Sequence, residues 1–361
     1  MKFSLFFEMQ IAEPTPRTER ELFHASVEQA VLADRLGYHA VWAVEHHGLR
    51  EYAHCSAPEI FLAHVAALTK RVRLGHGVTL TPYRYNHPMR IAERVAALDI
   101  LSDGRVYWGS GKSGSLTEQA AFESDIPSLH EQWLEAQQMI PRMWMDQVFE
   151  WNGKFLKIPP TQVVPKPVQT PHPPMFAACT VPQRAVEAGA MGLGVLNFAA
   201  GTQPELARKV ADYRAGVARA TPVGGRVTNH YSCTPFSTVL EDDRRACEIG
   251  FRGGRYFWTA QQAYYAHAFR PTGPIDADRG PLSEQDVEKA RSARLAPDAQ
   301  LTSIVGSPSA CREQIQRFAE AGVDELILIM QMGTVPLDVV ATSIRLFGEK
   351  VLPYFADSET A

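Results

Sequence analysis

Three consecutive residues able to carry protons, Glu45, His46 and His47, directly follow the short apolar run 41–44. A buried strand that ends in a polar loop has this pattern. An imidazole titrates near neutral pH, so either histidine could give or take a proton at a bound ligand. Neighbouring side chains of an extended segment point to opposite sides, so at most one histidine should face a central pocket. The alternative is a pair of loop histidines hydrogen-bonded to backbone.

The other candidate metal ligands do not favour a metal site. The sequence has no H-x-H, H-E-x-x-H or C-x-x-C pattern, so a zinc hydrolase is a weak alternative and we predict no metal. The cysteines are widely spaced and odd in number, which argues against a disulfide framework and favours a reducing, cytoplasmic setting. They are Cys55, Cys179, Cys233, Cys247 and Cys311.

Composition places the chain among ordinary globular proteins. Of its 361 residues, 45% are hydrophobic and 21% are charged, which suits a large buried core. The net charge is −4, and no run of Lys and Arg suggests a nucleic-acid surface. The apolar run at residues 3–7 is too short for a signal peptide or a membrane span, so we expect no membrane association.

Apolar runs alternate with amphipathic segments along most of the chain. Strands are expected at 3–7, 40–44, 72–78, 106–109, 175–178, 195–198, within 228–239, and at 325–330. Helices are expected between them, the first after a capping box at 18–21 and others at 58–68, 88–101 and 129–145. About eight such units with short loops predict parallel pairing, and hence an α/β fold with one TIM barrel as the single domain 1–361.

Two segments depart from this pattern. Residues 147–174 combine a hairpin-like turn at 151–155 with several prolines, and we interpret them as an irregular excursion before the fifth strand. Residues 267–300 are rich in Pro, Gly, Arg and Asp. They are either a surface loop or a mobile lid over the barrel mouth, because long loops in compact domains often act as lids.

Several segments, taken in order, resemble the bacterial luciferase-like family of flavin-dependent monooxygenases, and most closely the luciferase α chain. They are 1–3, 37–42 leading to 45–47, 87–93, 98–105, 305–308, 321–325 and 351–353. Each piece is weak alone, but their shared order and spacing over nearly the whole chain is specific. The resemblance implies a TIM barrel that forms a homodimer through its early helices.

The resemblance also implies a chemistry. Reduced FMN, delivered by a separate flavin reductase as transient partner, and molecular oxygen would oxidise a small hydrophobic aldehyde, ketone or heterocycle. His46 matches the family's catalytic histidine, with Glu45 and His47 as the residues that orient it. The second hypothesis is a deazaflavin-dependent hydride-transfer enzyme, because relatives with this barrel use that cofactor. The third hypothesis is a non-catalytic flavin-binding partner subunit, and the presence of all three residues 45–47 argues against it.

For the flavin phosphate, the resemblance points to the end of the fourth strand and the start of a helix. Lys112 stands where luciferase has a phosphate-contacting arginine, and lysine supplies charge without a bidentate fork. Free backbone N–H groups at a helix start favour an anion, and Val181 stands where the family often has serine. The helix-start candidates are Cys179, Thr180, Val181 and Arg184. A solvated lysine and a plain helix cap are the alternatives.

The flavin ring is expected against the third strand. The family has a non-proline cis peptide there, and Gly77–Val78 matches its position, with His76 beside it. The alternative is a glycine that lets backbone approach a ligand closely. Glu118 matches an acidic position in the loop after the fourth strand, or else it is a surface carboxylate.

Overall fold

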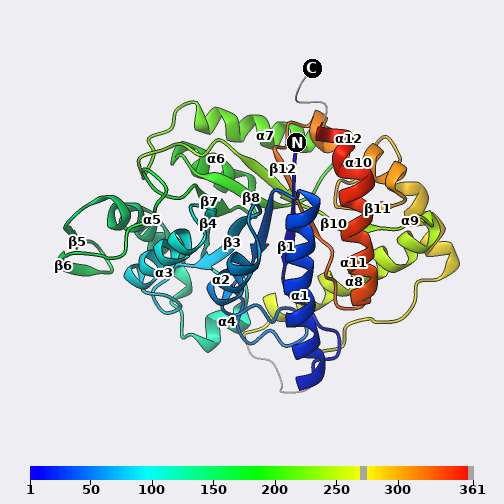
Figure 1. The fold of residues 1–361 in the computed structure, drawn as a ribbon, viewed down its shortest axis with the longest axis horizontal. Coiled ribbons are helices and arrows are strands. Elements are labelled where there is room, and N and C mark those ends of the chain that lie inside the picture. The colour runs from blue at the N-terminus through cyan, green and yellow to red at the C-terminus, as the bar shows by residue number, and fades with distance from the viewer. Residues whose placement is uncertain (269–274, 357–361) are drawn as a thin grey trace.

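A ring of parallel strands forms the centre of the computed structural model, which describes residues 1–268 and 275–356 (Figure 1). In order around the ring the strands are β1 (Lys2–Phe7), β2 (Ala40–Ala43), β3 (Arg73–Leu80), β4 (Val106–Gly111), β7 (Met175–Ala178), β8 (Gly194–Phe198), β9 (Tyr231–Thr234) and β12 (Glu325–Ile329). Pairing of β1 with β12, from Lys2 with Glu325 to Phe6 with Ile329, closes the ring. The described residues therefore form a closed barrel of eight parallel strands, and the predicted TIM barrel is confirmed.

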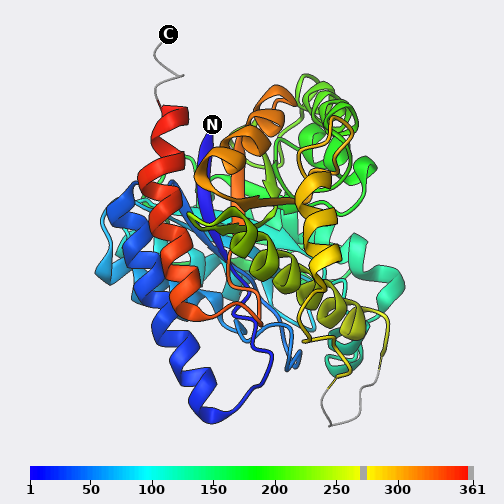
Figure 2. The same cartoon turned by 90° about the vertical axis from the view of Figure 1, so that its right-hand side faces the viewer.

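Helices cover the outside of the barrel, and α1 lies beside α11 in both views of Figures 1 and 2. They are α1 (Pro16–Leu36), α2 (Pro58–Leu68), α3 (Pro88–Leu101), α5 (Leu129–Met145), α6 (Pro182–Ala190), α7 (Gln203–Val217), α8 (Asp243–Tyr265), α10 (Pro308–Glu320), α11 (Leu337–Leu346) and the terminal η2 (Phe347–Val351) and α12 (Leu352–Ala356). Several begin with proline, whose missing N–H costs nothing in a first turn. The helices expected at 58–68, 88–101 and 129–145 have these bounds.

The first helix begins earlier than the capping pattern indicated. Thr15, not Thr18, is the N-cap: its hydroxyl accepts the backbone N–H of Thr18 at 3.1 Å, and the Thr18 hydroxyl accepts the N–H of Thr15 at 2.8 Å. The prediction of an N-cap at Thr18 was wrong because a threonine can replace the expected Glu as the reciprocal partner. Pro16 then occupies the first helical turn.

The segment between the last two ring strands is more structured than expected. The strand predicted within 228–239 is two strands, β9 and β10 (Phe236–Val239), and β10 pairs with an unexpected β11 (Ser303–Gly306). Within 267–300, residues 269–274 lie outside the described part. Helix α9 (Glu284–Ala293) occupies much of the rest and is held to Asp243 of α8 by Arg291. The expected irregularity is therefore only partial, and lid closure stays a prediction.

The excursion before β7 is confirmed as a departure from the barrel pattern. Its strands β5 (Phe149–Asn152) and β6 (Lys157–Thr161) pair antiparallel and project at the left edge of Figure 1. Ahead of it, α4 (Leu116–Ala121) and the short turn η1 (Ile126–Ser128) follow β4. In the described residues, no helix has both the length and the apolar character needed to cross a membrane.

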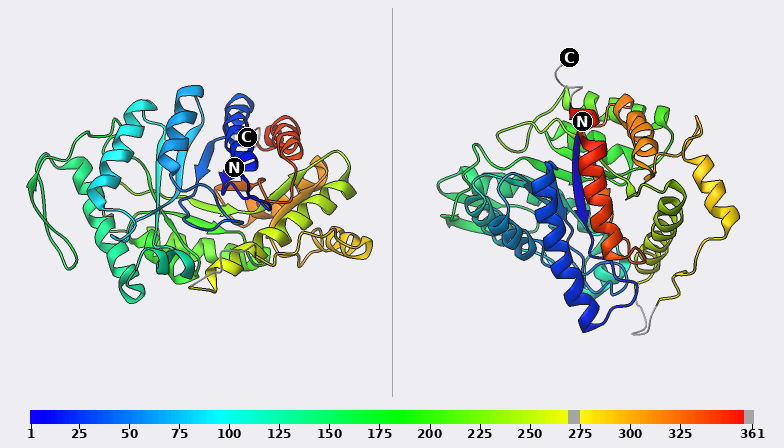
Figure 3. Two further views of the ribbon diagram at one scale, coloured as in Figure 1. Left: turned by 90° about the horizontal axis from the view of Figure 1, so that it is seen from below. Right: turned by 45° about the vertical axis from the view of Figure 1, so that its right-hand side comes forward.

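The strand directions define two ends of the barrel. In Figure 1 the N-terminus is at the top and β1 runs downward, so the C-terminal ends of the parallel strands face the lower end, seen directly in the left view of Figure 3. The upper end holds a buried charge cluster around Glu325, at the start of β12. Its Oε1 accepts the indole N–H of Trp42 at 3.0 Å and the hydroxyl of Ser4 at 2.5 Å, while Oε2 lies 2.8 Å from His230 Nε2. This cluster ties β1, β2, β9 and β12 together.

Loss of the Glu325 charge is expected to destabilise the barrel. Burial favours the neutral acid, but His230, His39 and Ser4 hold the pKa of Glu325 down to about 2. Glu325→Gln should therefore lower the free energy of unfolding by about 3 kcal/mol at pH 7, because it leaves its partners buried without the charge. Denaturant unfolding followed by circular dichroism measures this change.

The pH dependence of the free energy of unfolding tests the same assignment of Glu325. A carboxyl with a lowered folded pKa stabilises the fold above its ordinary 4.5, and this contribution is lost as pH falls from there toward 2. In Glu325→Gln the acid-induced loss of stability should shrink over that range. The exposed Glu248→Gln should match the parent protein. Equal stability of the Glu325→Gln and Glu248→Gln variants at pH 7 would contradict the assignment.

Candidate active site

A cavity of about 510 Å³ opens at the C-terminal end of the barrel. Its wall is built by residues of β1, β2, β3, β4, β7, β8 and β9 or of the loops that follow them, and by residues of α7 and α8. Ends of parallel barrel strands converge at one face, so residues far apart in sequence meet there. The volume suits a small-molecule site with an apolar wall and a few polar groups.

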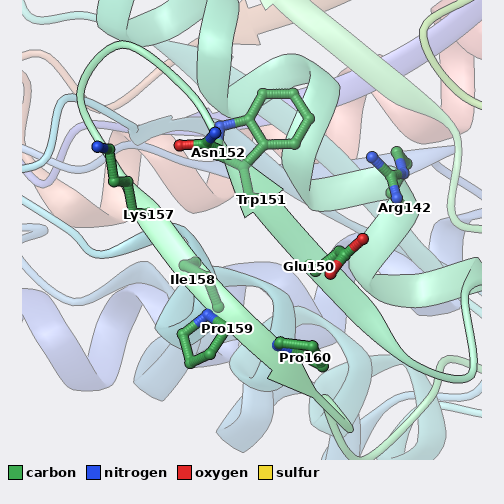
Figure 4. Close-up of a pocket in the computed structure, with 8 residues that line it drawn as sticks. All are labelled: Arg142, Glu150, Trp151, Asn152, Lys157, Ile158, Pro159 and Pro160. Carbon is green, nitrogen blue, oxygen red and sulfur yellow. The ribbon is translucent and has the colours of Figure 1, made fainter.

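A larger cleft of about 710 Å³ lies on the β5–β6 hairpin, outside the barrel (Figure 4). It is lined by Arg142, Glu150, Trp151, Asn152, Lys157, Ile158, Pro159 and Pro160. Trp151 fixes the hairpin to α5 by donating its indole N–H to Glu135 at 2.9 Å. None of the candidate catalytic or cofactor-binding residues from the sequence analysis lines this open cleft, so we place the chemistry in the barrel cavity.

The structure brings about half of the candidate residues onto the cavity wall. Those that line it are Glu45, His46, Gly77, Val78, Lys112, Thr180 and Val181. Those that stand behind or beside the wall are His47, His76, Glu118, Cys179 and Arg184. As the strand alternation predicted, only one of the two adjacent histidines lines the cavity.

His46 is held from behind by Glu118. Its Nδ1 lies 2.9 Å from Glu118 Oε1, which also accepts the backbone N–H of His47 at 2.8 Å. The other oxygen of Glu118 accepts the hydroxyl of Ser113 at 2.8 Å. Glu118 is fully buried in the first turn of α4, where Ser115 caps the helix, so the alternative of a surface carboxylate is wrong. This arrangement leaves Nε2 of His46 for the cavity.

Electrostatics keep this histidine charged. Burial alone would lower the pKa of His46, but the charge and hydrogen bond of Glu118, with the charges of Glu8 and Glu45, raise it to about 9. In turn, burial opposes ionisation of Glu118, but His46 and the N–H of His47 hold its pKa below the usual value. These charges therefore favour an imidazolium at His46 at neutral pH, with its Nε2–H left for the cavity. The expectation that His46 gives or takes a proton at a bound ligand stays a prediction.

Glu45, at the edge of the cavity wall, and His47, which does not line the cavity, form a second group. Glu45 accepts the backbone N–H of Leu80 at 2.7 Å and the side-chain amide of Asn86 at 2.8 Å. Its Oε1 lies 3.3 Å from His47 Nε2, and the His47 ring packs on Phe122 at 4.9 Å between centroids. These contacts connect the loops after β2 and β3 and so position the loop that carries His46, while the charge of Glu45 also helps to raise the pKa of His46.

Backbone of β3 forms part of the wall. The peptide between Gly77 and Val78 is cis, as the resemblance implied. A Cβ on Gly77 would come within 3.1 Å of Phe6 and 3.3 Å of Trp42, so little more than backbone fits there. His76 is buried on the other side, with Nδ1 3.3 Å from the Thr79 hydroxyl, and burial lowers its pKa to about 4. His76 therefore does not face the cavity.

Another part of the wall carries positive charge and the N-terminus of a helix. Lys112 follows β4, and Val181 is the N-cap of α6 without a side-chain bond to the helix start. Arg184 stands one turn into α6 but is paired with Glu187 at 2.7 Å. Cys179 is buried behind the strand end, where burial raises the pKa of its thiol to about 12. Lys112, Thr180 and the N-terminus of α6 thus give this part of the wall a positive potential, and their role in binding an anion stays a prediction.

Sequence inspection missed several residues of the wall. Glu8 follows β1 as Glu45 follows β2, and an acid directly after an apolar strand was the signal available. Lys209 from α7 also lines the wall, where its ammonium group donates to the carbonyl of Ala200 at 3.0 Å, and no local pattern marked it. Of the aromatic side chains on the apolar surface, the sequence had suggested Phe198 and Trp258 as pocket lining. It had not suggested Phe6, Tyr52, Tyr231 or Tyr265.

Comparison with known proteins agrees with this geometry. The chain is 34% identical over 188 residues to the oxygenase component of a flavin-dependent trigonelline monooxygenase from Acinetobacter baylyi, covering 50% of each chain. It is 31% identical over 236 residues to an F420-dependent hydroxymycolic acid dehydrogenase from Mycobacterium tuberculosis, covering 64% of this chain and 61% of the relative. These matches therefore span about half to three fifths of the relatives' length.

A solved structure and a family description extend the match. The crystal structure of monooxygenase RslO1 from Streptomyces bottropensis aligns with a TM-score of 0.82 and 26% identity, over 98% of this chain and 100% of that one. The family described as luciferase-like monooxygenase matches residues 1–325. With a closed barrel, a buried His–Glu pair at its mouth and this match over most of its length, the chain belongs to the luciferase-like monooxygenase family.

Proposed function

We propose that the protein is the oxygenase component of a two-component flavin-dependent monooxygenase, which uses reduced FMN and molecular oxygen to oxidise a small hydrophobic substrate. The observation that carries the proposal is the polarity of one cavity: imidazolium His46 on one side and Lys112 with the α6 N-terminus on the other. The apolar and aromatic wall between them suits a flat ring and an organic substrate. The Acinetobacter relative, named as an oxygenase component, supports a flavin reductase as partner.

The donor set fits FMN. Lys112, the Thr180 hydroxyl and the N-terminus of α6 would hold the phosphate, and the Gly77–Val78 backbone would lie against the ring. Reduced FMN, when bound, supplies the electrons that activate oxygen. The role of His46 is to donate a charged hydrogen bond from Nε2 to an oxygen atom in the cavity, while the wall excludes water.

A second candidate is hydride transfer with a deazaflavin. The M. tuberculosis relative, named as F420-dependent, favours it. The two candidates differ in their need for oxygen. Hydride transfer proceeds anaerobically, whereas oxygenation consumes one O₂ for each substrate oxidised.

Assay of the purified protein with photoreduced FMN tests the oxygenase proposal. Substrate-dependent oxygen consumption should appear with a panel of aldehydes, ketones and heterocycles. His46→Gln should lower kcat about 100-fold, because a preorganised donor to a developing charge is worth that much, while the exposed His267→Gln should retain the parent rate. Turnover of reduced F420 without oxygen, and none with FMN, would replace this proposal by the second candidate.

Phosphate recognition gives a test that needs no turnover. Lys112→Met should weaken FMN binding about tenfold, a loss of about 1.4 kcal/mol, because one charge near the phosphate is removed. Riboflavin, which has no phosphate, should bind equally to both forms. Fluorescence titration measures both affinities, and Lys289→Met on exposed α9 is the matched control. An equal loss of riboflavin affinity in Lys112→Met would show that Lys112 does not contact the phosphate.

We also propose a homodimer through α1 and α2. A shallow apolar cavity of about 360 Å³ lies between these helices, with Phe23 41% and Ile60 70% exposed at its edge. Ile60→Asp should yield monomers in light-scattering chromatography at concentrations where the parent protein is dimeric, because a charge would be buried in the interface. Leu101→Asp, equally exposed on α3, should stay dimeric. A monomeric parent protein would contradict the proposal.

A further inference from the structure

Glu8 is a buried acid of the cavity wall that has no role in the chemistry proposed above. It directly follows β1, and its side chain is buried at the cavity wall. One oxygen, Oε1, accepts the hydroxyl of Tyr52 at 2.9 Å. Among the described residues the other oxygen, Oε2, has no hydrogen-bond partner, and it lies 3.8 Å from Nε2 of His46. That separation is too long for a hydrogen bond between them.

The neighbouring acids are occupied, which singles out Glu8. Both oxygens of Glu118 accept hydrogen bonds, from His46, His47 and Ser113. Both oxygens of Glu45 accept hydrogen bonds as well, from Leu80 and Asn86. Oε2 of Glu8 and Nε2 of His46 are therefore the two atoms of this cluster left for a ligand. A buried polar group without a partner is costly, so such an atom marks a binding position.

The strand register explains why the two atoms meet. Strand β1 pairs with β2 so that Phe7 lies opposite Ala43, and both chains then leave the barrel at the same level. Glu8 is the next residue on one chain, and His46 follows shortly on the other. Neither position depends on a long loop.

Burial decides the proton state of Glu8. Burial raises the pKa of Glu8 to about 7, and the negative charge of Glu118 adds to this effect. The charge of His46 and the hydrogen bond from Tyr52 act in the opposite direction and lower the pKa. His46, by contrast, keeps its proton to about pH 9. The titratable and polar groups around Glu8 are His46, Glu45, Tyr52 and Cys55 from the loop after β2, Glu118 from α4, and Gln261 and Tyr265 from α8.

We infer that Glu8 is the proton donor of this site and that His46 is its fixed cationic partner. Oε2 of Glu8 and Nε2 of His46 bracket one oxygen atom of the bound ligand. Glu8 gives its proton to that oxygen: the O–H bond of the carboxyl breaks as an O–H bond forms on the ligand, and no electrons change hands. The carboxylate left behind faces the imidazolium, which stabilises it. Solvent protons restore the acid after product release.

This inference rests on the proposed oxygenase function, but its first test needs no flavin. In the full-length protein, infrared difference spectra against pH should show a buried carboxyl band that disappears with a midpoint near pH 7. Glu8→Gln should remove that band. Tyr52→Phe should move the midpoint upward, because the Tyr52 hydrogen bond favours the ionised form. Absence of the band, or its persistence in Glu8→Gln, overturns the inference whatever the activity.

Histidine NMR in the same samples separates the two roles. The His46 ring should stay protonated through neutral pH, and Glu118→Gln should lower its pKa more than Glu8→Gln does, since Glu118 contributes the larger attraction. A His46 that titrates near pH 7 in the parent protein, with Glu8 already ionised, overturns the assignment. Circular dichroism confirms that each variant is folded before its spectra are compared.

The kinetic test follows from the sign of the titration. An acid must be protonated to donate, so kcat should fall as pH rises above about 7, and Glu8→Gln should remove that fall and lower kcat about 100-fold. Glu8→Asp should restore part of the rate and the pH dependence. A pH profile unchanged in Glu8→Gln overturns the inference and leaves the oxygenase intact. If no oxygenase turnover is found, only the proposed function fails, because the spectroscopic result stands separately.

Discussion

The buried pair of His46 and Glu118 sets the state of the whole cavity. A carboxylate and an imidazole taken out of water need each other, because each alone would be driven to its neutral form. Together they hold a charge at the barrel mouth at neutral pH. The same carboxylate accepts the N–H of His47, so the pair also fixes the loop that carries it. Chemistry at the cavity therefore begins from a pre-formed cation.

Strand alternation divides the surrounding residues into groups with different tasks. His46 lines the cavity with Nε2 left for a ligand, while Glu45, at the edge of the wall, and His47, outside it, tie the loops after β2 and β3 together. The contacts of Glu45 and His47 therefore hold in place the loop after β2 that carries His46. Rigidity here comes from several charge-assisted bonds to backbone, which hold position better than side-chain packing on a loop does.

The cavity is also divided along its length. Acidic residues gather at the ends of β1 and β2, while the basic Lys112 after β4 and Lys209 on α7 line other parts of the wall, to which the start of α6 also belongs. A ligand with a phosphate at one end and a reacting centre at the other would be oriented by this field before any specific contact forms. The aromatic surface between the two ends contributes apolar burial and shape, which is where substrate selection within this family would reside.

Much of this could be read from the chain alone. Apolar periodicity determined the barrel, most strand positions and several helix bounds, since regular elements bury one face and repeat their pattern locally. The triplet 45–47 marked the site for the same reason: an acid and two histidines at a strand end are a local signal. Short strands such as β11, and a threonine serving in place of an acid at the start of α1, carried no signal strong enough to place them.

The tertiary structure alone decided which side chains meet. Glu118 reaches His46 across 72 positions of sequence, and Glu8 faces it only because β1 and β2 are neighbours in a closed ring. It also decided protonation: a histidine that is neutral on an isolated strand end becomes a lasting cation beside a buried carboxylate. Sequence determines what each residue can do locally, but burial and pairing are properties of distant segments brought together, so the charges in this cavity could be known only from the fold.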